Sequence, residues 1–76
     1  MTGEGVLMNP IMQAIHRSTL EARKRTGDEG ISVQVGSGQA QVVHVYYAPS
    51  GHYYLTPMSS KMPVGQVATY LDSYTV

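Results

Sequence analysis

The segment Gln41–Thr56, QVVHVYYAPSGHYYLT, is the longest run of apolar, β-branched and aromatic residues in the chain, and a turn signal divides it into two halves. Residues of these types favour strands, so the two halves predict a β-hairpin. Pro49 holds φ at about −65°, which excludes a two-residue loop whose first residue needs a positive φ. The remaining common choice is a three-residue loop, Pro49-Ser50-Gly51, with Gly51 in the left-handed conformation.

This loop sets the register of the predicted hairpin. It places Ala48 opposite His52, Tyr47 opposite Tyr53, Tyr46 opposite Tyr54, and Val45 opposite Leu55. Side chains alternate between the two faces of a strand. We expect the core face to carry Val43, Val45, Tyr47, Tyr53 and Leu55. We expect the open face to carry His44, Tyr46, Ala48, His52, Tyr54 and Thr56. A slip of one residue on one strand would break this division.

A helix is predicted before the hairpin. Asn9 is a favoured N-cap, Pro10 suits the first helical position, and Gly27 suits the left-handed position after the last turn, so the helix should run from Pro10 to about Arg25. Its apolar stripe consists of Ile11, Ile15, Ser18 and Ala22, flanked by Met12 and Thr19. Leu20 falls outside this stripe. It is an exposed residue, a contact for a second helix, or part of an interface.

The remaining patterns complete a small α+β domain. Ile31–Val35 alternates as a half-buried strand does, and a three-residue Gly36-Ser37-Gly38 loop would put Ile31, Val33 and Val35 on the face of Val43. Pro57 should end the third strand. A second helix is predicted with Ser59 or Ser60 as its cap, Pro63 in its first turn, and an apolar stripe of Val64, Val67, Ala68, Leu71 and Tyr74.

The predicted architecture is therefore αβββα, a three-stranded antiparallel sheet with two helices on one face. We expect residues 1–76 to form one domain. Residues 1–8 are expected to be a flexible tail whose Val6 and Leu7 dock on the domain. A domain this short buries a small core, so a homodimer would add buried surface.

The composition of the chain excludes several classes of function. The chain carries five basic and five acidic residues, which argues against a protein whose affinity comes chiefly from neutralising phosphates. It has no cysteine, hence neither a disulfide nor a thiolate metal site. There is no apolar run of the ~20 residues that a membrane span needs. The N-terminus lacks the basic region and apolar core of a signal peptide, so we expect a cytoplasmic protein.

Candidate catalytic and metal-binding groups are few. His16, His44 and His52 titrate near neutral pH, but the predicted register separates His44 from His52 by ~13 Å along the hairpin, too far to share a metal ion. The Asp28-Glu29 turn lacks the further oxygen ligands of a calcium loop. We therefore expect no enzymatic activity, no cofactor and no metal.

Three functions fit these observations. The leading hypothesis is a protein-interaction module, an inhibitor or adaptor of the size that phages and other mobile elements carry as accessory proteins. Its partner-binding residues would be His44, Tyr46, His52, Tyr54 and Thr56, with Leu20. The second is a single-stranded nucleic-acid binder that stacks bases on Tyr46 and Tyr54. Its phosphate contacts would be Arg23, Lys24 and Arg25. The third is a homo-oligomer formed through the Tyr/His face or an open strand edge.

Overall fold

The computed structural model describes residues 9–74. Its elements are α2 (Pro10–Thr26), β1 (Ile31–Gly36), β2 (Gln39–Tyr47), β3 (Tyr53–Pro57), β4 (Met62–Pro63) and α3 (Val64–Ser73). The predicted α+β class, the order of the elements and the antiparallel three-stranded sheet are confirmed, with the short β4 added. Residues 1–8, on which the expected tail falls, lie outside the described residues.

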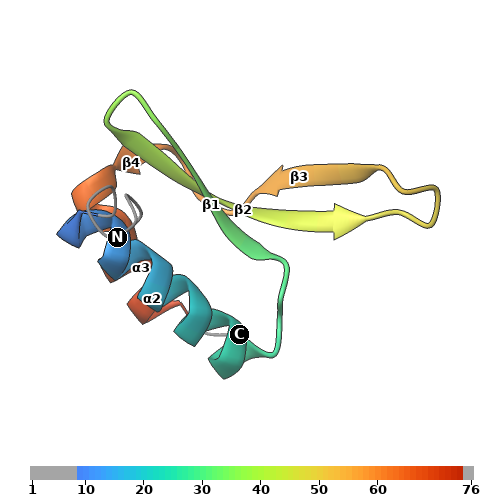
Figure 1. Cartoon of the computed structure of the whole chain (residues 1–76), viewed down its shortest axis with the longest axis horizontal. Coiled ribbons are helices and arrows are strands. Elements are labelled where there is room, and N and C mark those ends of the chain that lie inside the picture. The colour runs from blue at the N-terminus through green and yellow to red at the C-terminus, as the bar shows by residue number, and fades with distance from the viewer. Residues whose placement is uncertain (1–8, 75–76) are drawn as a thin grey trace, which may run out of the picture.

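β2 is the central strand, and it is longer than its neighbours. β1 pairs with residues 39–44 of β2 on one side, and β3 pairs with residues 43–47 on the other. β4 pairs with Gln39 and Ala40, at the beginning of β2. β1 and β3 therefore flank the same part of β2 only around Val43 and His44. The far end of β2 continues with β3 as a two-stranded ribbon that projects beyond the helices (Figure 1).

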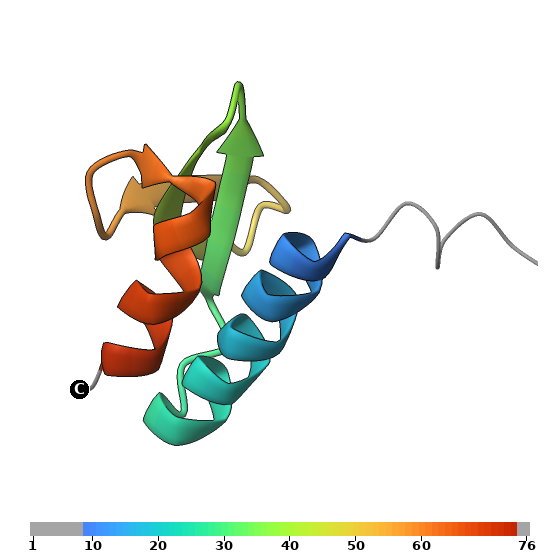
Figure 2. The ribbon, with the colours of Figure 1, turned by 90° about the vertical axis from the view of Figure 1, so that its left-hand side faces the viewer.

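The predicted caps of α2 are confirmed. The Asn9 side chain accepts a hydrogen bond from the Met12 amide at 2.8 Å, and Gly27 has φ 75°. The buried residues of the helix are Ile15, Ser18, Thr19 and Ala22. The prediction that Ile11 belongs to the core stripe is wrong, since 46% of its surface is exposed. The first turn of α2, to which Ile11 belongs, diverges from the end of β1 (Figure 2).

α2 and α3 lie side by side on one face of the sheet, with their C-terminal ends together (Figure 2). The carbonyl ends of two helices repel one another, because each carries a partial negative charge. Arg25 places a positive charge between these ends, and its guanidinium donates hydrogen bonds to the carbonyl oxygens of Leu71 (2.7 Å) and Tyr74 (3.0 Å). The core between helices and sheet consists of Ile15, Ala22, Ile31, Ala40, Val42, Val67 and Leu71.

The face of the sheet that the helices cover differs from the prediction. The turn after β1 has two residues, not three: Ser37 (φ 55°) and Gly38 (φ 76°) are both left-handed, and Gly36 lies opposite Gln39. Hairpin turns of this type match the natural twist of the strands. The register of β1 is therefore shifted by one residue, so that Val33 lies opposite Val42 and Ile31 opposite His44.

The shift reverses the predicted division into core and open faces for β2 and β3, but not for β1. The helices cover the face that holds Ile31 and Val33, as expected. The residues of β2 on that face are Ala40, Val42 and His44, and His44 was expected on the open face. The expected core face, with Val43, Val45, Tyr47, Tyr53 and Leu55, lies on the side of the sheet away from α2 and α3. Of these five residues only Val43 is buried, between Ser32 of β1 and Pro57 of β3.

The start of the second helix also differs. Its N-cap is Pro63, with no side-chain hydrogen bond. Ser59, one of the two expected caps, instead accepts a hydrogen bond from the Val42 amide through its hydroxyl at 3.1 Å. This bond ties the β3–β4 connection to β2. Val67 and Leu71 are buried as predicted.

Candidate functional site

The β2–β3 hairpin has the predicted loop and register. Ala48 donates its amide to the His52 carbonyl at 2.8 Å, and Gly51 donates to the Ala48 carbonyl at 3.0 Å. Gly51 has φ 92°, which favours glycine because it has no side chain to clash there. Val45 lies opposite Leu55, Tyr46 opposite Tyr54, and Tyr47 opposite Tyr53. Pro49 thus fixes which residues meet across the ribbon.

Both faces of this ribbon are exposed. Beyond Val45, β2 has no partner in β1, and the helices do not reach beneath it (Figure 1). All four tyrosines of the ribbon are therefore between 55% and 72% exposed, and Leu55 is 41% exposed. We call Tyr46, Tyr47, Tyr53, Tyr54 and Leu55 the tyrosine ribbon.

The rings of the tyrosine ribbon form one cross-strand pair on each face. The ring centroids of Tyr46 and Tyr54 lie 6.4 Å apart with the planes at 24°, and those of Tyr47 and Tyr53 lie 5.9 Å apart at 47°. Cross-strand aromatic pairs stabilise a two-stranded ribbon, which is marginal in water without them. The pairing also orders the rings before any partner arrives, so that less conformational entropy is lost on binding.

The ribbon carries no formal charge. From Gln39 to Pro57 the chain contains no Asp, Glu, Lys or Arg. The histidines of this segment are His44 and His52. An uncharged surface of tyrosine rings, each with a hydroxyl that can donate or accept a hydrogen bond, suits a partner of similar polarity.

His44 lies at the base of the ribbon. Its Nε2 is 2.9 Å from Asp28 Oδ1, and the same oxygen accepts a hydrogen bond from the Gly30 amide at 2.9 Å. The Gly30 hydrogen bond, together with the hydrogen bond and charge of His44, lowers the pKa of Asp28 below its ordinary value despite partial burial. His44 therefore fixes the ribbon to the α2–β1 turn.

The other predicted partner-binding residues are not all on one surface. Tyr46, Tyr54 and Thr56 share the face of His44, and His52 lies at the tip with its Nδ1 3.0 Å from the Ser50 hydroxyl. Leu20 is 41% exposed but lies on α2, where it lines a separate hollow with Arg23, Lys24 and Glu29.

The structure adds Tyr47, Tyr53 and Leu55 to the predicted surface. Sequence reasoning assigned them to the core because their face of the hairpin is the more apolar one. The signal that could have found them is length: a nine-residue central strand extends further than a ten-residue helix, α3, because a strand rises about 3.3 Å per residue and a helix 1.5 Å.

Two of the three predicted phosphate-binding residues hold backbone carbonyls. Arg23 donates through Nε to the Ile31 carbonyl at 2.8 Å, and Arg25 donates to Leu71 and Tyr74. Lys24 is exposed. Within residues 9–74, no group of three His, Asp or Glu side chains could hold a metal ion. No helix of this described part is long and apolar enough to cross a membrane.

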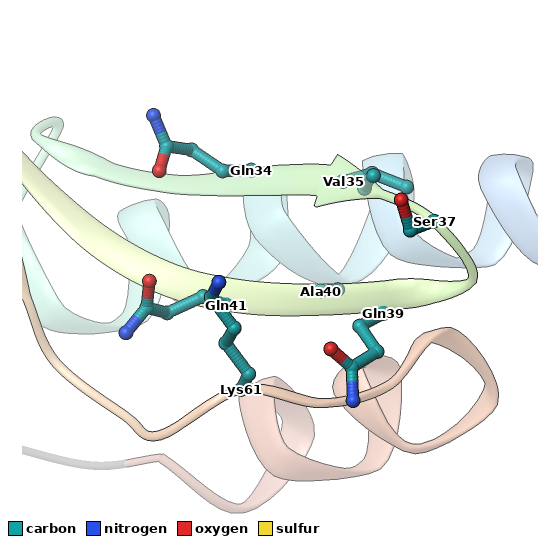
Figure 3. Close-up of a pocket in the computed structure, with 8 residues that line it drawn as sticks. Gln34, Val35, Ser37, Gln39, Ala40, Gln41 and Lys61 are labelled. Carbon is teal, nitrogen blue, oxygen red and sulfur yellow. The ribbon is translucent and has the colours of Figure 1, made fainter.

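A second hollow, of about 430 Å³, lies beside the β1–β2 turn (Figure 3). It is lined by Gln34, Val35, Gly36, Ser37, Gln39, Ala40, Gln41 and Lys61. Lys61 extends toward Gln41, whose amide nitrogen donates to the Ser59 carbonyl at 2.9 Å. The polar side chains that line this hollow are mostly exposed, so a ligand would gain little from leaving water there.

Comparisons of this chain with protein-family models, with curated proteins and with solved structures find no match.

Proposed function

We propose that this chain is a non-enzymatic protein-interaction module, of the inhibitor or adaptor class, that binds another protein through the tyrosine ribbon. The observation that carries the proposal is an uncharged ribbon whose four tyrosines are exposed on both faces. Tyrosine is enriched among the residues that contribute most to protein interfaces, whereas charged residues are depleted at their centres.

The exposed rings offer enough area to anchor an interface. If a tyrosine has about 200 Å² of surface, exposures of 55–72% leave roughly 500 Å² of ring surface on the ribbon. A standard interface buries about 800 Å² on each partner. The ribbon alone would supply more than half of one side, and a partner that grips both of its faces would bury all four rings.

The nucleic-acid alternative has less support. Base stacking on tyrosine needs cations nearby to hold the phosphates, and the ribbon has none. Arg23 and Arg25 already donate to backbone carbonyls. A nucleic-acid complex would also weaken steeply with salt, whereas a complex of uncharged rings with a protein would respond little.

The test compares capture of a partner from the native host by four baits. They are the unaltered chain, Tyr46→Ala with Tyr54→Ala, Tyr47→Ala with Tyr53→Ala, and Thr69→Ala as a control at an exposed position of α3. With the purified partner, we expect each double variant to weaken binding about 30-fold or more by calorimetry. The control should remain within about twofold.

Circular dichroism must show that all four baits are folded. Equal affinity of both double variants and the unaltered chain would refute the proposal. Competition by single-stranded oligonucleotides, with affinity that falls steeply as salt rises, would favour the nucleic-acid alternative instead.

A further inference from the structure

β1 is an edge strand with unpaired backbone groups. Val45 donates its amide to the Gly30 carbonyl, which makes the adjacent pair Ile31–His44 one without mutual hydrogen bonds. By alternation, the amide and carbonyl groups of Val33 and Val35 also point away from β2. The outward carbonyl of Ile31 is already bonded to Arg23. Val33 and Val35 thus present two donors and two acceptors that bond to nothing within residues 9–74.

This edge lacks the usual protection. In natural edge strands, charged residues, proline or a bulge commonly prevent pairing with a strand of another chain. The sequence of β1, ISVQVG, contains no charge and no proline, and Val35 is 45% exposed. An unguarded apolar edge is a template for another strand.

An apolar flank continues from the edge. A hollow of about 340 Å³ separates β1 from α2, where the two elements diverge (Figure 2). Its lining is Met12, Ile15, His16, Thr19, Arg23, Ser32, Val33 and Val35. Ile11, also exposed, lies next to Met12 in the first turn of the helix.

We infer that a second copy of this chain pairs with the β1 edge, antiparallel and about a two-fold axis at Gln34. The free segment is self-complementary: the axis sets Val33 of one copy against Val35 of the other, and the four resulting N–H···O bonds use every free group of the two residues. Arg23 on Ile31 ends the pairing on one side, and the Ser37-Gly38 turn ends it on the other.

The charge of the edge is compatible with this partner. No charged side chain stands on β1, so the two strands do not repel one another. A specific interface buries at least ~1,000 Å² in total, or ~500 Å² on each copy. Reaching that area requires the α2 flank as well as the edge. The dimer should therefore be reversible and dependent on concentration.

Sedimentation equilibrium of the full chain from about 10 μM to about 1 mM tests the inference, since weak dimers dissociate in this range. The unaltered chain should shift from monomer to dimer mass. Val35→Lys, which puts a charge on the edge, should raise the dissociation constant at least tenfold. Leu55→Lys is the matched control: Leu55 is 41% exposed on the other edge strand, β3, and this variant should dimerise normally.

Hydrogen exchange of the unaltered chain provides a second measurement that needs no variant. The amides of Val33 and Val35 should become protected as concentration rises. A monomer mass throughout the range would overturn the inference. So would a dimer that Leu55→Lys dissociates and Val35→Lys does not, because that result would assign the contact to the hairpin. Capture of a partner through the tyrosine ribbon should be unaffected by Val35→Lys, so the two proposals can fail separately.

Discussion

Replacing Gly30 with alanine should destabilise the base of the tyrosine ribbon. Gly30 does not have a positive φ, so its backbone conformation does not demand glycine. The lack of space at this position demands glycine, because an added Cβ would lie 2.7 Å from the Val45 carbonyl oxygen and 2.8 Å from His44 Nε2. The first neighbour belongs to the backbone of the central strand, and the second cannot move without breaking its hydrogen bond to Asp28.

Three hydrogen bonds meet at this point. They join the Val45 amide to the Gly30 carbonyl, the Gly30 amide to Asp28, and His44 to Asp28. At about 1 kcal/mol each, their loss costs about 3 kcal/mol. Alanine returns about 0.4–1 kcal/mol by restricting the unfolded chain. The expected net loss is about 2 kcal/mol, a fall in Tm of about 8–16 °C for a domain of this size.

Thermal unfolding followed by circular dichroism measures this loss. Gly65→Ala is the matched control, because a Cβ at Gly65 in α3 meets no atom within 4 Å. Alanine is the better helix former, so the control should raise stability by up to about 0.5–1 kcal/mol. The reasoning is refuted if Gly30→Ala unfolds at the same temperature as the unaltered chain, or above it.

Three further predictions concern stability. Because the pKa of Asp28 is lowered in the folded chain, its ionised form stabilises the fold above about pH 4, the ordinary range of an Asp carboxyl. This contribution disappears as pH falls through the lowered pKa. Asp28→Asn should therefore flatten the pH dependence of Tm in that acidic range. Asn9→Ala removes the cap on the Met12 amide and should cost about 1 kcal/mol in urea unfolding. Arg25→Ala removes the donor to the carbonyl oxygens of Leu71 and Tyr74 at the end of α3 and should lower Tm by about 4–8 °C. Arg17→Ala, at an exposed position of α2, should leave Tm unchanged.

Local chemistry made part of this fold predictable. Pro49 excludes the two-residue hairpin loops, and the observed loop and all cross-strand partners of the ribbon agree with that reasoning. The caps at Asn9 and Gly27 likewise follow from short-range preferences and were confirmed. Pro49 acts by fixing φ, Asn9 by a side-chain hydrogen bond to the Met12 amide, and Gly27 by permitting a positive φ.

The β1–β2 turn had no such restriction. Gly36-Ser37-Gly38 is compatible with a two-residue or a three-residue loop, since glycine tolerates either conformation. The difference of one residue changed which residues of β2 share a face with Ile31 and Val33, so the helices cover the face of Val42 and not that of Val43. Only the packing of the core, with Ile31 and Val42 against Val67 and Leu71, decides between the two registers.

The candidate site was partly predictable for a different reason. Tyr46 and Tyr54 were expected to be exposed because the helices would cover the opposite face. They are exposed because the ribbon extends past the helices, and for that reason Tyr47 and Tyr53 are exposed too. How far two helices reach along a sheet depends on tertiary geometry, which periodicity does not encode.

Photo-crosslinking from the tyrosine ribbon tests the central claim most directly. A benzophenone amino acid would replace Tyr46 on one face, Tyr53 on the other, or Thr69 on α3 as a control, and the chain would be irradiated in its native host. We predict that one and the same protein is crosslinked from both ribbon positions and not from α3. Adducts from Thr69 alone, with none from either ribbon position, would contradict the account.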